Sequence, residues 1–173
     1  KTHYTAVRDA LADHPVKVYA GSDALEQVVC SEQVDTVVMA LVGYSGLFPT
    51  VSALKHGKKV ALANKECLVV AGEIVTRLSA EHRAPIIPVD SEHSAIFQCL
   101  TGEHSAVEKV ILTASGGPFL HRPAEELERV SVEEALNHPS WCMGAKVTID
   151  SASLMNKGFE VIEAHWLFGT PAE

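Results

Sequence analysis

The chain has 173 residues, of which 47% are hydrophobic and 21% are charged, and its formal net charge is −8. This composition is typical of a globular protein that is long enough to bury one good core or two small ones. The acidic charge argues against a protein that coats nucleic acid, and the longest apolar run, Val37–Val42, is too short to span a membrane. The four cysteines show neither a CxxC pair nor zinc-like spacing, so we interpret them as free thiols.

The first half of the chain alternates short apolar segments with helical patterns. We predict strands at 16–20, 36–42, 59–63 and 85–89, and helices at about 23–31, 49–57 and 73–82. Fully apolar strands that alternate with helices favour a parallel sheet covered on both faces. Ligands of such sheets bind outside the carboxyl ends of the strands. We therefore expect Gly43–Gly46, Asn64–Glu66 and Asp90–Glu92, which follow three of these strands, to line one rim.

The pattern changes after about residue 88, where we place a boundary between two units. The second unit is predicted to contain helices at 91–101, 131–136 and 156–168, strands at 107–113 and 146–150, and loops at 115–118 and 137–144. Ser131 and Glu134 have the spacing of a capping box at the start of the middle helix.

Two acidic residues follow the last strand of the first half. Asp90 and Glu92 lie two residues apart on an extended segment, so their carboxylates project to the same side and can reach one cation. The alternative is that Asp90 or Ser91 caps the following helix, with Glu92 as a first-turn acid.

A second polar cluster lies around the start of the last predicted helix. Asn156, Lys157 and Glu160 share one face of it, and Ser151 and Ser153 precede it. Uncharged donors and a lysine near a helix start favour a bound phosphate. A solvated ion pair between Lys157 and Glu160 is the alternative.

Two loops complete the set of candidate features. The glycines of the loop 115–118 allow a ligand to approach the backbone closely, although such a loop signal is weak by itself. The loop 137–144 holds a titratable ring at His138 and a large aromatic at Trp141, and Gly144 closes it. This composition suits a lid that excludes water, whereas Trp141 as an anchor of the loop to the core is the alternative.

Five sequence blocks together resemble one enzyme family, 1-deoxy-D-xylulose 5-phosphate reductoisomerase of the methylerythritol phosphate route to isoprenoids. The blocks are LANKE at 62–66, VDSEH at 89–93, ASGGPF at 114–119, NHPSWCMG at 137–144 and IDSASLMNKGFE at 149–160. They occur in the order of the family and cover nearly the whole chain from Val34 to Phe168.

The resemblance implies an α/β chain. Residues 1–88 are expected to form the second half of a Rossmann-like, parallel-sheet NADPH-binding domain, and residues 89–173 an α+β catalytic domain. The glycine-rich NADPH fingerprint is expected upstream of Lys1 and the C-terminal helical domain after Glu173, so the fragment alone is expected to be inactive.

The implied activity is an NADPH-dependent oxidoreductase that rearranges and reduces 1-deoxy-D-xylulose 5-phosphate to 2-C-methyl-D-erythritol 4-phosphate. The resemblance further implies a divalent cation, Mg²⁺, Mn²⁺ or Co²⁺, a phosphorylated sugar as the partner, a homodimer without nucleic acid or membrane, and a location in the bacterial cytoplasm or a plastid.

The resemblance also implies a role for individual residues. The metal ligands are expected to be Asp90, Glu92 and Glu160. The residues expected to contact the substrate are Lys65 and Ser91 at its reacting end, and Ser115, His138, Ser151, Asn156 and Lys157, most of them at its phosphate. NADPH is expected to contact Asn64, Glu66 and Gly144, and the lid to contain Trp141 and Met143.

Two other functions fit parts of the same pattern. A metal-dependent sugar-phosphate isomerase or aldolase without nicotinamide would keep the carboxylates and the phosphate donors. A non-catalytic phosphate-binding domain would keep only the phosphate donors. Binding of NADPH would exclude the first, and a functional metal site would exclude the second.

Overall fold

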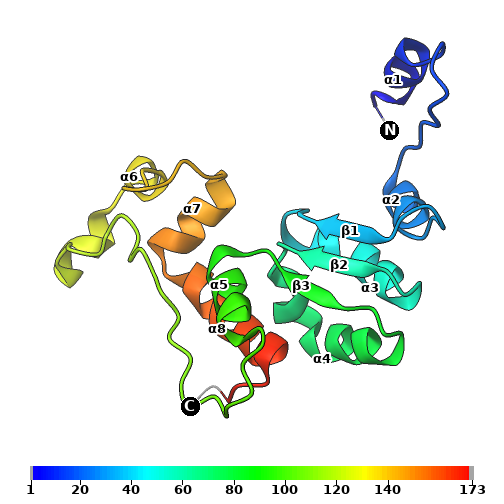
Figure 1. The fold of residues 1–173 in the computed structure, drawn as a ribbon. Helices are drawn as coiled ribbons and strands as arrows, with labels where there is room; N and C mark the ends of the chain where they lie inside the picture. The colour runs from blue at the N-terminus through cyan, green and yellow to red at the C-terminus, as the bar shows by residue number, and fades with distance from the viewer. Residues whose placement is uncertain (1, 172–173) are drawn as a thin grey trace. The chain divides into compact units, whose positions relative to one another are not determined.

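The computed structural model describes residues 2–171, and the chain divides into two compact units, residues 1–87 and residues 88–173 (Figure 1). The first unit contains a parallel three-stranded sheet in the order β1 (Thr36–Met39), β2 (Lys59–Leu62) and β3 (Ile86–Pro88). Val37 of β1 is paired with Val60 of β2, and the two strands run parallel. The α/β class and the parallel sheet predicted from the sequence are thus confirmed.

In the residues that the structure describes, the first unit also contains five helical segments. They are α1 (Tyr4–Ala10), α2 (Ser22–Val29), the 3₁₀ helix η1 (Gly43–Gly46), α3 (Leu47–Lys55) and α4 (Glu66–Glu81). The helix predicted at 73–82 is the second part of α4, which begins earlier and has a non-helical backbone at Ala71. The core is made by apolar side chains that are 0% exposed, including Leu54, Leu62, Leu68 and Val75. Each buried aliphatic side chain of this kind stabilises a fold by about 1.5–3 kcal/mol.

The second unit is built from helices in the part that the structure describes. They are α5 (Ser91–Leu100), the 3₁₀ helix η2 (Ala124–Arg129), α6 (Val132–Leu136), α7 (Ala145–Ala152) and α8 (Met155–Phe168). The predicted capping box is confirmed, because the Ser131 hydroxyl accepts from the Glu134 N–H and the Glu134 carboxylate accepts from the Ser131 N–H. Figure 1 shows α5 and α8 side by side, and this pair carries the polar cluster described below.

The strand predicted at 146–150 is wrong, because these residues form most of α7. The β-branched residues Val147, Thr148 and Ile149 misled the prediction, since such residues are also accommodated in helices. The helix has local support that the strand pattern hides. Lys146 and Asp150 form an ion pair of 2.7 Å one turn apart, and the Thr148 hydroxyl donates to the Gly144 carbonyl at 3.0 Å.

The strands predicted at 16–20 and 107–113 are also wrong, because neither segment is extended into a ladder in the structure. A strand is stable only when a neighbouring strand satisfies its backbone groups. No described strand pairs with either segment, and their apolar side chains lack cover. Val16 is 55% exposed and Ile111 is 76% exposed.

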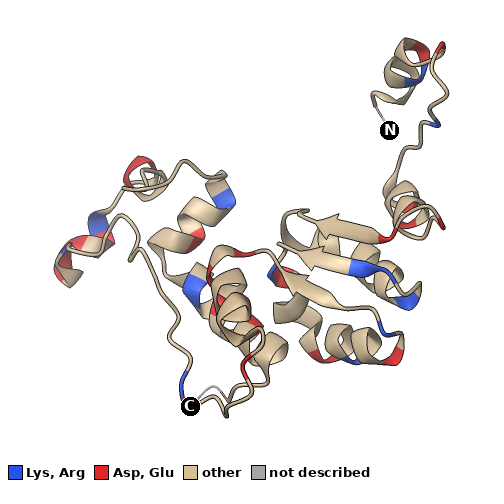
Figure 2. Ribbon diagram, in the orientation of Figure 1, with Lys and Arg blue, Asp and Glu red and all other residues tan. Residues whose placement is uncertain are grey.

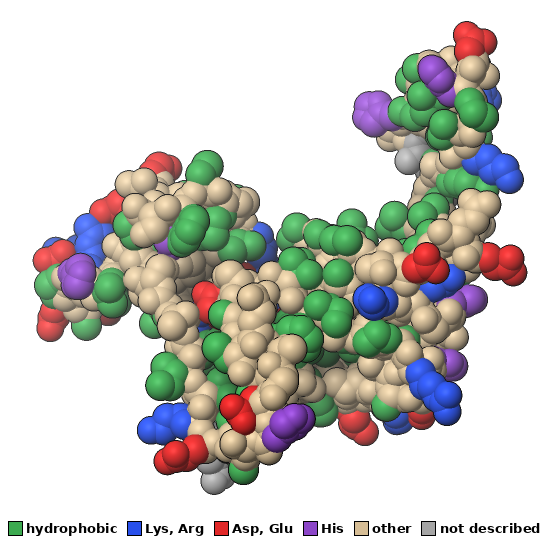
Figure 3. Space-filling view, viewed as in Figure 1, with side chains coloured by type: hydrophobic (Ala, Val, Ile, Leu, Met, Phe, Trp, Pro, Cys, Tyr) green, Lys and Arg blue, Asp and Glu red, His purple; other side chains and the backbone are tan. Residues whose placement is uncertain are grey.

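Charged residues of both signs are spread over both units rather than gathered in one basic patch (Figure 2). On the face seen in Figure 3, hydrophobic side chains lie between the charged ones. Several large apolar side chains near the end of β1 are exposed, among them Val38, Val42, Tyr44 and Phe48. No helix in residues 2–171 is both long and apolar enough to cross a bilayer.

Candidate active site

The three predicted metal ligands lie together in the second unit. Asp90 precedes α5, Glu92 is in its first turn, and Glu160 is in α8; their carboxylate oxygens lie within 4.8 Å of one another. The capping interpretation is confirmed as well, since the Asp90 carboxylate accepts from the Ser91 N–H at 3.0 Å. Capping one N–H occupies only one oxygen of a carboxylate, so the two interpretations are compatible. Three carboxylates form a donor set that fits a hard divalent cation.

Glu160 is fully buried, and its two carboxylate oxygens accept hydrogen bonds from two neighbours on the same helix. Asn156 Nδ2 donates to Glu160 Oε1 at 2.6 Å, and Lys157 Nζ donates to Glu160 Oε2. Lys157 Nζ also donates to Glu92 Oε1 at 3.1 Å. An unpaired buried carboxylate would cost several kcal/mol (about 3–5 when a partner is removed), so these contacts stabilise the cluster. The predicted phosphate-binding and metal-binding side chains therefore contact one another directly.

The ionisation of Glu92 reflects the same contacts. Burial by itself would raise the pKa of Glu92, but hydrogen bonds from the Ser91 hydroxyl and Lys157 hold the pKa below its ordinary value. The Ser91 hydroxyl donates to Glu92 Oε2 at 2.6 Å. Glu92 is therefore ionised at neutral pH, as a cation ligand must be.

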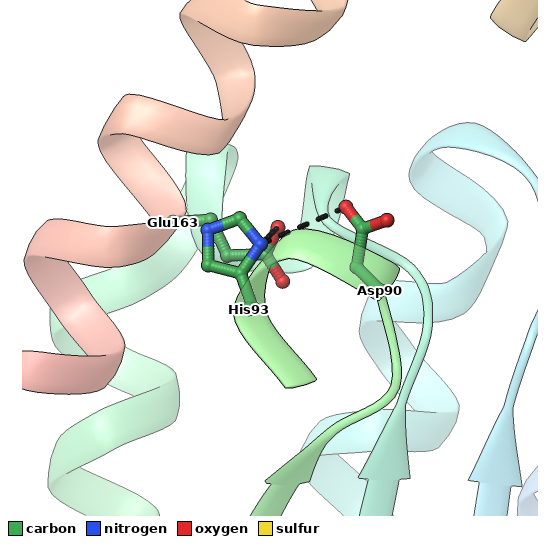
Figure 4. Close-up of side chains that lie close together, drawn as sticks. All are labelled: Asp90, His93 and Glu163. Carbon is green, nitrogen blue, oxygen red and sulfur yellow. Dashed lines mark ion pairs between the residues drawn. The ribbon is translucent and has the colours of Figure 1, made fainter. Parts of the chain in front are cut away.

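A second buried cluster adjoins the first (Figure 4). His93 and Glu163 are both 0% exposed, and His93 Nδ1 lies 3.3 Å from Glu163 Oε2 and 3.8 Å from Asp90 Oδ2. Burial by itself would lower the pKa of His93, but the contact with Asp90 and the charge of Glu163 raise the pKa above its ordinary value. The sequence reasoning missed both residues. The available signal was spacing, since each follows a predicted metal ligand by three residues on a helix.

Ser115 and His138, predicted to hold the substrate, are brought together by the loops that precede η2 and α7. His138 Nδ1 accepts from the Ser140 N–H at 3.1 Å and from the Trp141 N–H at 3.0 Å. A ring nitrogen that accepts is unprotonated, so the ring proton lies on Nε2, which faces Ser115 Oγ at 3.1 Å. Ser115 Oγ also accepts from the Gly117 N–H at 3.2 Å, which leaves its own proton for a ligand.

Ser151 of α7 lies against the same loop. A Cβ atom built on Gly117 would lie only 2.6 Å from the Ser151 carbonyl oxygen, and Gly117 has a positive φ of 72°. Both observations explain why glycine is required there. The loop 115–118 is thereby held close to Ser151, another predicted substrate contact.

We expect Gly117→Ala to destabilise the second unit by about 2–4 kcal/mol, because strain at positive φ adds about 1–2 kcal/mol to the cost of the backbone clash. Gly102→Ala is the matched control, since Gly102 has a φ of 80° but no atom within 4 Å of a built Cβ. Urea unfolding of both variants separates the two costs. Equal destabilisation by Gly117→Ala and Gly102→Ala would show that the close contact with Ser151 adds nothing to the cost of the substitution.

The predicted lid residues lie on the surface. Trp141 is 67% exposed and Met143 is 36% exposed, so in this structure Trp141 does not anchor its loop to a core. Gly144 ends the loop as the N-cap of α7. Its φ of −62° is available to any residue, and a built Cβ would meet no atom within 4 Å.

The predicted contacts Asn64, Lys65 and Glu66 belong to the first unit, between β2 and α4. The Asn64 amide donates to the Leu41 carbonyl at 2.6 Å and the Gly43 carbonyl at 2.9 Å, and accepts from the Cys67 N–H at 2.9 Å. It thus ties together the segments that follow β1 and β2, which are two of the three segments predicted to line one rim. Asn64 and Lys65 are buried, and Glu66 begins α4.

Comparisons with known proteins point to one enzyme family over most of the chain. The family described as 1-deoxy-D-xylulose 5-phosphate reductoisomerase matches residues 1–72, and the C-terminal domain of the same enzyme matches residues 86–168. The reductoisomerase of Porphyromonas gingivalis is 61% identical over 165 residues, which are 95% of this chain and 43% of that protein. The one from Bacteroides fragilis is 62% identical over 167 residues, 96% of this chain and 43% of that protein.

Solved structures give the same result. A reductoisomerase in complex with NADPH, fosmidomycin and magnesium matches with a TM-score of 0.89 at 41% identity, over 99% of this chain and 45% of that one. The enzyme from Zymomonas mobilis in complex with NADPH matches with a TM-score of 0.88 at 43% identity, over 99% of this chain and 44% of that one. The chain thus spans less than half the length of the relatives that it matches. Over that span, this chain belongs to the 1-deoxy-D-xylulose 5-phosphate reductoisomerase family.

Proposed function

We propose that this chain supplies the metal-binding and substrate-binding residues of an enzyme that converts 1-deoxy-D-xylulose 5-phosphate to 2-C-methyl-D-erythritol 4-phosphate with NADPH and a divalent cation. The observation that carries the proposal is the contact between two groups of side chains. Asp90, Glu92 and Glu160 form a carboxylate cluster, and Lys157 touches two of its members. The proposed cation site and a proposed phosphate ligand thus adjoin each other, which supports binding of one small sugar phosphate by both.

The carboxylate cluster is the proposed cation site, for Mg²⁺, Mn²⁺ or Co²⁺. When bound, the cation would stabilise negative charge that develops on the carbonyl and hydroxyl oxygens of the substrate, and NADPH would supply the hydride. The burial of Glu160 and the pairing of Glu92 with Ser91 orient the ligands before the cation arrives. Such preorganised ligands lower the cost of assembling the site.

The polar side chains predicted from the sequence to hold the substrate form the proposed phosphate site. Ser115 has a hydroxyl proton available because its oxygen already accepts from Gly117 and faces the Nε2 proton of His138. Ser151 lies next to that loop, and Asn156 and Lys157 extend from α8. Charge-assisted hydrogen bonds from a lysine to a phosphate contribute about 1.5–3 kcal/mol each. The phosphate thus supplies binding energy away from the reacting bonds.

The NADPH contacts proposed here are Asn64, Glu66 and Gly144, with Lys65 at the reacting end of the substrate. Asn64 and Glu66 follow β2, and the carboxyl end of a parallel strand is where such sheets bind ligands. The amide of Asn64 is engaged with Leu41 and Gly43, so it contributes by fixing the loop that follows β1. A clearer test of the cofactor contact is available at Gly144.

We expect Gly144→Ala to leave stability within about 0.5 kcal/mol of the wild type, because the backbone and the space allow a Cβ. If NADPH approaches this glycine closely, the same change should raise the KM for NADPH several-fold. Thermal melting checks the expected stability, and steady-state kinetics check the expected KM for NADPH. An unchanged KM would remove Gly144 from the cofactor contacts.

The proposal is tested with a full-length form, in which the segments that flank this region in the curated relatives are supplied. Oxidation of NADPH is followed by absorbance with 1-deoxy-D-xylulose 5-phosphate and Mn²⁺, with and without a chelator. We expect oxidation that the chelator abolishes. A folded protein that binds the sugar phosphate without oxidising NADPH would favour an isomerase or aldolase instead.

The assembly and location of the protein are part of the same proposal. We expect a homodimer in the bacterial cytoplasm or a plastid, with no nucleic acid and no membrane as partner. Light scattering of the full-length form measures the mass directly, and a monomeric mass would contradict the homodimer.

A further inference from the structure

His93 and Glu163 form a pair of ionisable side chains in the interior of the second unit. Both are 0% exposed, and His93 Nδ1 lies 3.3 Å from Glu163 Oε2 (Figure 4). Burying such groups is expensive, and well-packed apolar residues of the same volume are often as stable or more stable. Stability by itself therefore gives no reason for the pair at this place.

The contacts of His93 give a reason, because the ring connects to two of the three proposed metal ligands. Its Nε2 donates to the backbone carbonyl of Glu160 at 2.9 Å, and its Nδ1 lies 3.8 Å from Asp90 Oδ2. Asp90 precedes α5 and Glu160 lies in α8, 70 positions later in the chain. A single imidazole thus fixes the two elements that must supply ligands to one cation.

Glu163 fixes the ring in turn. Its carboxylate lies beside the same Nδ1 atom that faces Asp90, and Figure 4 marks an ion pair from this nitrogen to each of the two carboxylates. Rotation of the imidazole would break the contacts with Glu163, Asp90 and the Glu160 carbonyl together. Groups that hydrogen-bond or orient metal ligands typically affect metal affinity about 10–100-fold.

We propose that His93 and Glu163 are positioning residues, which hold Asp90 and the backbone of Glu160 in the geometry that one divalent cation requires. This inference rests on the proposed cation site. We assign neither residue a contact with the cation or the substrate, and each acts through the ligands.

The test compares Mn²⁺ affinity, measured by electron paramagnetic resonance on the full-length form, among single variants. Glu163→Gln keeps the shape of the side chain and removes its charge. We expect it to weaken Mn²⁺ binding about 10–100-fold, whereas Glu128→Gln, at an exposed position of η2, should bind as the wild type does. Activity at saturating Mn²⁺ should recover most of its wild-type value in Glu163→Gln.

A purely structural role would lower the melting temperature of the metal-free protein and leave the Mn²⁺ affinity of the folded protein unchanged, which would overturn the inference.

The wild type and Glu160→Gln separate this inference from the proposed function. If the wild type does not bind Mn²⁺, or Glu160→Gln binds it equally well, the proposed cation site fails and the inference with it. If Glu160→Gln loses binding and Glu163→Gln binds as the wild type does, only the inference fails.

A second pair of variants covers the case in which Glu163→Gln does not fold. His93→Gln places an amide near Nε2, so it keeps a donor to the Glu160 carbonyl and loses the group that faces Asp90 and Glu163. His93→Asn places an amide near Nδ1 and loses the contact with the carbonyl. We expect both to bind Mn²⁺ more weakly than the wild type. Wild-type affinity in both would overturn the inference.

Discussion

Glu160→Gln is expected to reduce kcat/KM of the full-length form by at least about 100-fold, the loss typical of a removed electrostatic contributor to the transition state. The carboxylate lies within 4.8 Å of the other two proposed ligands and is fully buried. Glutamine keeps the volume but replaces a charged oxygen ligand with a neutral amide. The cation would then lose one of three charges that hold it, and Lys157 would lose one of its two carboxylate partners.

The measurement is steady-state turnover as a function of Mn²⁺ concentration, together with thermal melting. Glu128→Gln is the control for the loss of one negative charge, since Glu128 is exposed. If Glu160→Gln turned over normally at low Mn²⁺, Glu160 would not be a ligand. A lower melting temperature with normal Mn²⁺ dependence would assign it a structural role only.

Lys157→Met is expected to weaken binding of the sugar phosphate without weakening binding of the cation. Loss of a charge-assisted contact of about 1.5–3 kcal/mol should raise the KM for the sugar phosphate about 10–100-fold. Affinity for Mn²⁺ should stay the same or rise, because the ammonium that is removed lies 3.1 Å from Glu92 Oε1 and also contacts Glu160. A positive charge beside a cation site opposes the cation.

Inorganic phosphate and Mn²⁺ binding, each measured by calorimetry, separate the two effects. Lys109→Met is the matched control, since Lys109 is an exposed lysine of the same unit. Weaker Mn²⁺ binding in Lys157→Met would contradict the electrostatic argument. Unchanged phosphate affinity would place the phosphate elsewhere.

The helices α5 and α8 and the first-unit sheet were predictable because their patterns are local. The strands at 36–39 and 59–62 and the helix α5 lie within their predicted ranges, α8 begins one residue before its predicted start at 156, and the capping box at Ser131 is observed. The failures at 16–20, 107–113 and 146–150 share a cause. Whether β-branched residues form a strand depends on a partner strand, which no local pattern contains. At 146–150 the ion pair between Lys146 and Asp150 supports the helix instead.

For the proposed site, too, some features follow from the local sequence and others from tertiary contacts. The sequence by itself determined the family through the ordered blocks, and it predicted the chemistry, since the residue types at Asp90, Glu92, Glu160 and Lys157 suit a cation and a phosphate. Only the tertiary structure decided which of these side chains touch. The contact between Lys157 and Glu92 and the buried pair of His93 and Glu163 join residues 65 and 70 positions apart. Packing of α5 against α8 creates these contacts, and the free energy of that packing is not encoded in either helix alone.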